Sequence, residues 1–143
     1  MAIIQSMCTS FKQEVMQGVH NLNAVGGDTF KLALYTNGAV LTPATTVYTP
    51  LNEVPASGTY VAGGGVLTNS GVLASSATAF ASFLDISFTS ASITAFGALI
   101  YNSSRGNKAV AVINFGANKT SLNSTFTVRF PPYNATSAII RID

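Results

Sequence analysis

Residues 93–115 read ITAFGALIYNSSRGNKAVAVINF, two apolar runs separated by a polar hexapeptide. The runs Ile93–Tyr101 and Lys108–Phe115 are rich in β-branched and aromatic residues, which favour strands. Between them, Asn102–Asn107 supplies the Asn, Ser and Gly residues that turns require. This stretch therefore predicts an antiparallel hairpin.

Segments with strand periodicity continue on both sides of this hairpin. Phe30, Leu32 and Leu34 alternate with more polar residues along Asp28–Thr36, which is typical of a strand with one buried face. The other predicted strands are Thr59–Ala62, Val66–Asn69, a long strand with Phe80, Ser82, Leu84, Ile86 and Phe88 on one face, one with Phe126, Val128 and Phe130, and Ala138–Ile142. Seven or eight short antiparallel strands predict a mainly β fold, an antiparallel β-sandwich or a jelly-roll-like barrel.

Residues that favour turns separate these strands. We expect a turn at residues 89–92, a turn at Asn37-Gly38 and a bulge or tight turn at residues 63–65, where three glycines follow one another. Residues 39–58 contain three prolines and predict an extended excursion with little regular pairing. Pro131-Pro132 is expected to end the strand before it.

The first 25 residues have a different periodicity. Apolar residues recur at helical spacing and predict one amphipathic helix whose apolar face carries Met7, Phe11, Val15, Val19 and Leu22. Ser10 and Gln13 could form a capping box, with Ser6 or Thr9 as alternative starts, and Gly26-Gly27 is expected to end the helix. The face is expected to pack on the open face of the sheet or, alternatively, on a neighbouring subunit.

The length of 143 residues is that of one compact domain, and no linker divides it. We therefore expect a single β domain over residues 1–143, with an N-terminal helical segment at 1–25 and a β-sandwich at 28–143. No apolar run is long enough for a transmembrane helix, and the N-terminus lacks the basic and apolar regions of a signal peptide. The sequence predicts synthesis in a reducing cytoplasm and no membrane partner.

Charged residues make up only 8% of the chain, against about a quarter in a typical domain. Ser, Thr and Asn replace them and together occupy 42 positions. The composition excludes a coiled coil and a disordered chain. The charge is uneven, because residues 105–143 carry five basic residues and one acid. These basic residues are spaced singly, which indicates solvated strand edges and turns, or contact with an acidic protein surface, and argues against direct nucleic-acid binding.

Few residues are suited to catalysis or to metal binding. The only histidine, His20, falls near the end of the predicted helix, where interaction with the helix dipole accounts for it. The five carboxylates show no paired spacing, and Asp85 is expected to pair with a basic side chain or to face water. The only cysteine, Cys8, is expected to be buried as a small apolar residue. We expect no enzyme, no metal site and no cofactor.

A surface with little charge gives little repulsion between molecules and suits a protein that is covered by copies of itself or by a larger lattice. The helix and the proline-containing excursion are the elements expected to reach a neighbour. The candidate interface residues are Met7, Phe11, Val15, Val19, Tyr48, Leu51, Arg105 and Lys108.

Five segments spread over nearly the whole chain carry a resemblance to a known family. They are MAIIQSMCTSFKQE at 1–14, DTFKLALYT at 28–36, GALIYN at 97–102, KAVAV at 108–112 and NATSAIIRI at 134–142. The sequence resembles the small structural virion proteins of tailed bacteriophages. These segments have the character of strands and a helix, so the resemblance transfers no active site.

The resemblance implies a structural component of the virion, made in the host cytoplasm. We expect a capsid decoration or cement protein that binds the major capsid protein and forms a homo-oligomer, for which a trimer is one arrangement that the family resemblance suggests. The alternatives are a tail, neck-adaptor or fibre-anchoring protein that binds another virion protein, and a glycan-binding module, against which the absence of Trp counts.

Overall fold

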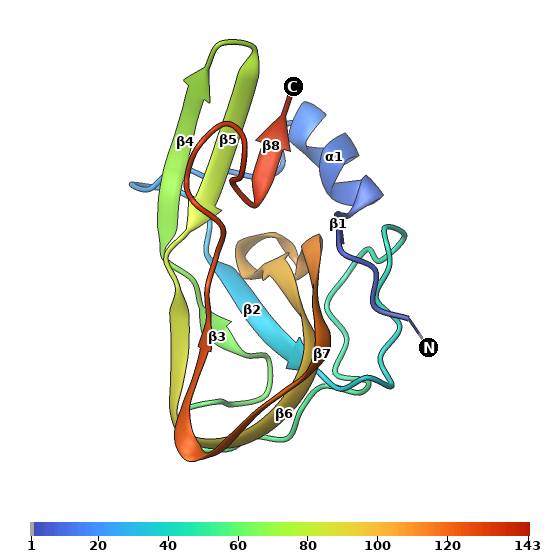
Figure 1. The fold of residues 1–143 in the computed structure, drawn as a ribbon. Coiled ribbons are helices and arrows are strands. Elements are labelled where there is room, and N and C mark those ends of the chain that lie inside the picture. Colours follow the sequence, from blue (N-terminus) through green and yellow to red (C-terminus); the bar gives the residue numbers. More distant parts are fainter. Residues whose placement is uncertain (1) are drawn as a thin grey trace.

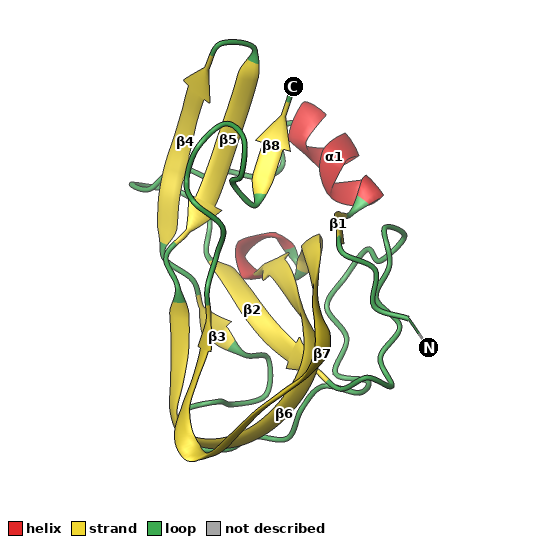
Figure 2. Ribbon diagram, in the orientation of Figure 1, coloured by secondary structure: helices red, strands yellow, loops and turns green. Residues whose placement is uncertain are grey.

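The computed structural model describes residues 2–143, which form two antiparallel sheets and one short helix (Figures 1 and 2). The mainly β, sandwich-like fold predicted from the sequence is confirmed. The elements in chain order are β1 (Ser6–Met7), α1 (Thr9–Met16), β2 (Phe30–Tyr35), β3 (Gly65–Val66), β4 (Asn69–Ser75), β5 (Thr78–Phe83), β6 (Ile86–Asn102), the 3-10 turn η1 (Ser103–Arg105), β7 (Lys108–Val128) and β8 (Ile140–Ile142). One sheet has the order β1-β7-β6-β2-β3, and the other has the order β4-β5-β8.

The β6–β7 hairpin is the predicted hairpin of residues 93–115, and it is longer than expected. Its strands pair from Asn102 and Lys108 at the turn to Ile86 and Val128 at the open end. Asn102 caps η1 by accepting a hydrogen bond from the backbone N–H of Ser104. The turn then closes through Gly106, whose φ of 65° is the left-handed conformation that glycine adopts without strain.

The turn expected at residues 89–92 is instead a bend inside one continuous strand. The pairing of β6 with β7 shifts register between Phe88 and Ile93, and Ser90 and Asn123 both have positive φ there. Such bulges bend a two-stranded ribbon without ending it. The ribbon consequently folds back at the lower end of Figure 1, which gives β7 two limbs on either side of the bend.

The long strand predicted through Phe80 and Phe88 is wrong, because the chain changes sheets within it. β5 ends at Phe83, Leu84 is exposed, and β6 begins at Ile86. The side chain of Asp85 between them faces solvent and accepts a hydrogen bond from the backbone N–H of Phe130. The β4–β5 hairpin that precedes this crossover was not predicted, since its turn at Ser76-Ala77 lacks both glycine and proline.

The predicted helix over the first 25 residues is also wrong in extent. Gly18, with a φ of 74°, ends it: the backbone N–H groups of Gly18 and Val19 donate to Val15 and Glu14, which is a Schellman motif. Met7 lies on β1, and Val19 and Leu22 lie in the following loop. The expected capping box is absent, because the N-cap is Cys8 and makes no side-chain cap bond.

The helix packs beside the start of β7 and next to β8 (Figure 1). The backbone N–H groups at its start are satisfied by other segments, since that of Cys8 donates to Val110 and that of Thr9 donates to Pro43. Phe11 is buried in the core, and Val15 packs against it. The helix therefore covers part of its own chain's core, as the first of the two expected arrangements requires.

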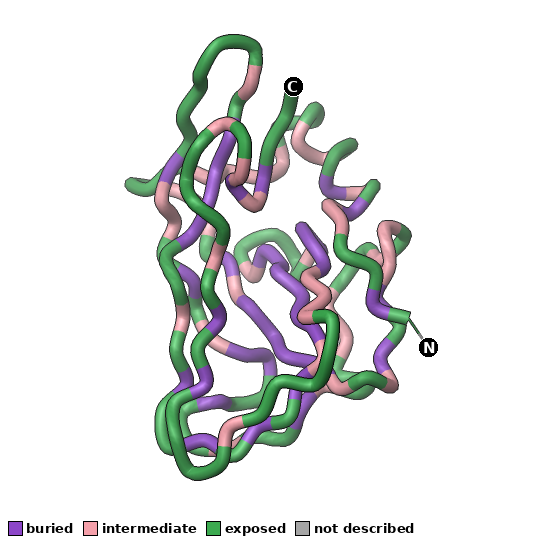
Figure 3. The backbone as a smooth tube through the Cα atoms, in the orientation of Figure 1, coloured by how far each residue is buried: buried purple, intermediate pink, exposed green. Residues whose placement is uncertain are grey.

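The core lies between β2, the turn-proximal limbs of β6 and β7, and the loop over residues 36–64 (Figure 3). β2 is almost entirely buried, so both of its faces are covered, where the sequence predicted one buried face. The loop contains no strand, as predicted for residues 39–58, and contributes Leu41, Val54 and Tyr60 to the core. Its end is the glycine turn, in which the N–H of Gly64 donates to Val61.

The strand predicted at Thr59–Ala62 is wrong, because a tight turn with one isolated bridge between Ser57 and Tyr60 takes its place. The strand predicted at Val66–Asn69 is divided between the end of β3 and the start of β4.

Gly64 is where the fold tolerates a side chain least. A Cβ there would lie 1.8 Å from the carbonyl oxygen of Leu32, at a φ of 84°. We expect Gly64→Ala to lower the free energy of unfolding by about 3 kcal/mol or more. Gly106→Ala is the matched control, because its φ is 65° but no atom lies within 4 Å, so only the backbone cost of about 1–2 kcal/mol applies. Urea unfolding measures both, and equal losses would contradict the close approach.

Candidate functional site

The single histidine lies in a buried polar cluster. The side chain of His20 has no exposed surface, and its Nε2 lies 2.9 Å from Oε1 of Glu14. Its Nδ1 lies 2.9 Å from Nδ2 of Asn102, which is also fully buried. Because the amide oxygen of Asn102 accepts from the N–H of Ser104, the amide nitrogen is the group that faces the ring. This network assigns the acceptor role to Nδ1 and the proton to Nε2, which donates to Glu14.

Asp28 is the second acid of this cluster. Its Oδ2 accepts from the Asn102 amide at 2.9 Å, from the backbone N–H of Asn21 at 2.9 Å and from Nε of Arg105 at 3.1 Å. Oδ1 forms an ion pair with the same guanidinium at 3.1 Å. Burial alone would raise the pKa of Asp28, but the hydrogen bonds from Arg105, Asn102 and Asn21 and the charge of Arg105 hold it below its usual value.

The cluster joins the segment after α1, the start of β2 and the β6–β7 turn. The His20 ring packs on Phe11, with centroids 4.8 Å apart, and Nζ of Lys108 lies 3.7 Å from Glu14. His20 follows the helix end and does not lie in its last turn, so its bond to Glu14 replaces the expected dipole interaction. With both ring nitrogens bonded and the ring buried, this geometry supports a structural role.

A second polar centre surrounds Glu53 in the loop before β3. Its two carboxylate oxygens accept from the hydroxyls of Tyr48 at 2.5 Å and Tyr60 at 2.6 Å, and the N–H of Gly63 donates at 2.8 Å. Tyr60 also accepts from the N–H of Leu34 in the middle of β2. Burial and the Glu53 carboxylate raise the pKa of Tyr48 and Tyr60, and the same two causes raise the pKa of Tyr101 to about 12. These phenols stay protonated, and their hydrogen bonds hold the loop over residues 36–64 against the sheet.

Cys8 is buried, as expected from the sequence, and its burial, followed by the nearby Glu14, raises the pKa of the thiol to about 11. Within residues 2–143, no group of three or more His, Cys, Asp and Glu side chains is placed to hold a metal ion.

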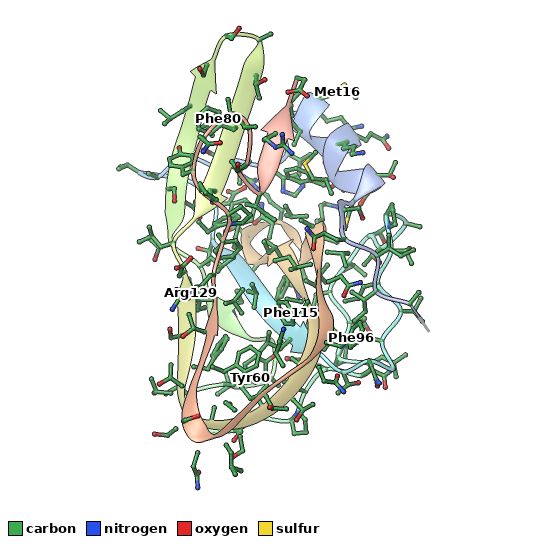
Figure 4. The ribbon with its side chains drawn as sticks, in the orientation of Figure 1. Met16, Tyr60, Phe80, Phe96, Phe115 and Arg129 are labelled. Atoms are coloured by element: carbon green, nitrogen blue, oxygen red, sulfur yellow. The ribbon has the colours of Figure 1, made fainter. Side chains whose placement is uncertain are left out.

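The structure distributes the N-terminal interface candidates between interior and surface. Phe11 is buried and is not part of the free surface, whereas Met7, Val15 and Val19 are half-buried. The sequence pattern did not single out Met16, which is 84% exposed at the end of the helix (Figure 4). The helical periodicity did not indicate the exposure of Met16, because the apolar residues continue at helical spacing to Leu22 while the helix ends at Met16.

Of the other four candidates, Tyr48 and Lys108 lie on adjacent segments, because Val47 forms a β-bridge with Lys108 and the N–H of Tyr48 donates to Asn107. Tyr48 is hydrogen-bonded to Glu53 and stacks on Tyr101, with centroids 4.7 Å apart. Arg105 and Lys108 form ion pairs with acids of their own chain. Leu51 is 71% exposed at the surface of the loop.

Sequence reasoning missed an apolar groove between α1 and the β4-β5-β8 sheet. The groove has a volume of about 530 Å³. Val15 and Leu22 line one side, and Val72, Phe80 and Ile142 line the other. Val72 and the neighbouring Leu73 are about half exposed on β4, an edge strand of its sheet. The β4–β5 hairpin that forms one wall of the groove could have been recognised only from the alternation of small and apolar residues over 69–83.

Comparison of the chain with protein-family models, with curated proteins and with solved structures finds no match. No helix within residues 2–143 has the length and apolar character needed to cross a membrane.

The lowered pKa of Asp28 predicts the acid sensitivity of the fold. An aspartate whose pKa is lower in the folded than in the unfolded state, where it is about 3.9, contributes stability above that value. This contribution is lost as the pH falls through the folded-state pKa. We expect the difference in unfolding free energy between the wild type and Asp28→Asn to narrow steadily as the pH is lowered from 5 to 2.

Urea unfolding at several pH values measures this difference. Arg105→Gln is the partner variant, since it removes the guanidinium that lowers the pKa of Asp28 and should weaken the same pH dependence. A difference between wild type and Asp28→Asn that stays constant down to pH 2 would contradict the assignment.

Proposed function

We propose that this chain is a structural component of a bacteriophage particle, and most directly a capsid decoration protein that stabilises the shell by binding major capsid subunits. The observation that supports the proposal most is that acidic side chains interact with groups of their own chain. Glu14 forms an ion pair with Lys108, and Asp28 forms one with Arg105. Glu53 accepts a hydrogen bond from the hydroxyl of Tyr60. What remains on the surface is mainly hydroxyls, amides and aliphatic side chains, which suits a protein covered by neighbours.

Two apolar features offer surface for attachment. The groove beside α1 opens next to the exposed Val72 and Leu73 of β4, and Met16 is exposed at the end of the same helix. A contiguous exposed apolar surface is typical of protein-binding sites. The β4–β5 hairpin also extends beyond the rest of the molecule at the top of Figure 1, where it can reach a neighbouring subunit.

The identity of the particle rests on the sequence. The resemblance of residues 1–14, 28–36, 97–102, 108–112 and 134–142 to small virion proteins of tailed bacteriophages supports a virion location. It also supports the partners that we propose: further copies of this chain, in a homo-oligomer such as a trimer, and the major capsid protein. No catalytic activity, cofactor or nucleic-acid contact is part of this proposal.

The copy number per particle tests the proposal. A decoration protein that covers joints between capsid subunits is present in a number comparable to the major capsid protein. We expect its band in purified particles to correspond to hundreds of copies, and particles lacking it to lose resistance to heat and osmotic shock. A count near a dozen or below would contradict decoration and indicate a tail or neck component.

A pair of variants shows whether attachment uses the apolar surface beside α1. Met16→Glu places a charge at that surface, and Leu122→Glu places one at the ribbon bend, where the leucine is 83% exposed. Both should fold, because both side chains are mostly in solvent. The Met16 variant should be depleted from particles while the Leu122 variant is retained, and equal retention would remove this surface from the proposal.

A further inference from the structure

The fold-back of β7 creates a second groove, far from α1 in sequence. It has a volume of about 370 Å³ and is lined only by residues 113–129, from both limbs of the strand. Phe115 from one limb and Phe126 from the other form part of its wall, with ring centroids 6.4 Å apart. In Figure 4, Phe115 and Arg129 are labelled on the two different limbs.

The charge of this groove is entirely positive. Lys119 lines it from the first limb and Arg129 from the position directly after the second, and no acidic side chain lines it. Within residues 2–143, neither Lys119 nor Arg129 forms an ion pair, whereas Arg105 and Lys108 both pair with acidic side chains. Asp85 accepts a hydrogen bond from the backbone N–H of Phe130, next to Arg129, but does not line the groove.

The backbone beside this groove is also open to a partner. β7 pairs with β6 along one edge, but β1 pairs with the other edge only at Ala111 and Val112. Beyond these, the side chain of Gln5 reaches the N–H of Asn114, and no further strand of residues 2–143 follows that edge. An uncovered strand edge can accept an extended segment through main-chain hydrogen bonds.

We propose that the groove between the two limbs of β7 binds an extended acidic segment of a neighbouring protein. Carboxylates of the segment pair with Lys119 and Arg129, and its apolar side chains contact Phe115 and Phe126. Two cations in a short groove suit two or three carboxylates, whereas a nucleic-acid backbone requires a longer run of phosphate contacts. The proposal rests on the proposed function only for the identity of the protein that carries the segment.

Fluorescence anisotropy with a labelled octapeptide of alternating Glu and Val tests the site on the full chain. We expect saturable binding that weakens with added salt. The Lys119→Gln/Arg129→Gln variant should bind at least tenfold more weakly. Lys12→Gln/Arg141→Gln removes the same charge from α1 and β8 and should bind within twofold of wild type. Amide chemical shifts in the NMR spectrum of the wild type should change mainly within residues 113–129.

Three results would overturn the proposal: no saturable binding of the octapeptide, equal weakening by both double variants, or tighter groove binding by a single-stranded oligonucleotide of the same length. None of these results alters the copy number in purified particles. Failure of the groove proposal is therefore distinguishable from failure of the proposed function.

Discussion

The buried amide of Asn102 is the interaction on which the other parts of this structure depend. Its oxygen accepts from the turn of the β6–β7 hairpin at Ser104, and its nitrogen donates to His20 and to Asp28. One side chain thereby joins the central hairpin to the segment after the helix and to the residues that lead into β2. An amide can satisfy these partners because it both donates and accepts, which an ionised side chain cannot do.

The same use of polar groups explains how a chain with so few charges holds long irregular segments in place. The loop over residues 36–64 contains no strand, yet Glu53 ties it together through Tyr48 and Tyr60, and Tyr60 bonds to β2 at Leu34. Buried polar groups that are fully hydrogen-bonded specify one arrangement of such a loop. Because these acids and tyrosines are used for the fold, the surface left for function is apolar or neutral, with a cationic groove at the bend of β7.

The sequence predicted the parts of the fold that depend on local pattern. The central hairpin, β2, the glycine turn and the final strand follow from alternation and turn residues that act within a few positions. The bend of the ribbon at Ser90 and Asn123 was read as a turn, since bulges use the same residue types as turns. The early end of the helix could have been recognised from Gly18, but apolar residues at positions 19 and 22 continued the helical spacing by coincidence.

The polar clusters and grooves were not predictable from the same patterns. Asn102 and His20 are 82 residues apart, and no local spacing indicates that they meet. Six of the candidate interface residues were chosen from their position in the predicted helix or loop, and the structure shows that Phe11 is interior and that Tyr48 belongs to the Glu53 cluster. The groove within β7 depends on the fold-back of one strand, which brings Lys119 and Arg129 to the same opening.

The free energy of unfolding of Asn102→Ala tests most directly whether the polar residues of this chain serve its fold. The substitution removes the hydrogen bond to the buried ring of His20, one of the bonds to Asp28 and the cap of the Ser104 N–H, so we predict a loss of about 3 kcal/mol or more. Asn114→Ala is the matched control, because that partly exposed amide bonds only to Ile3 and Gly116 and should lose about 1 kcal/mol. Equal small losses for both variants would contradict the account.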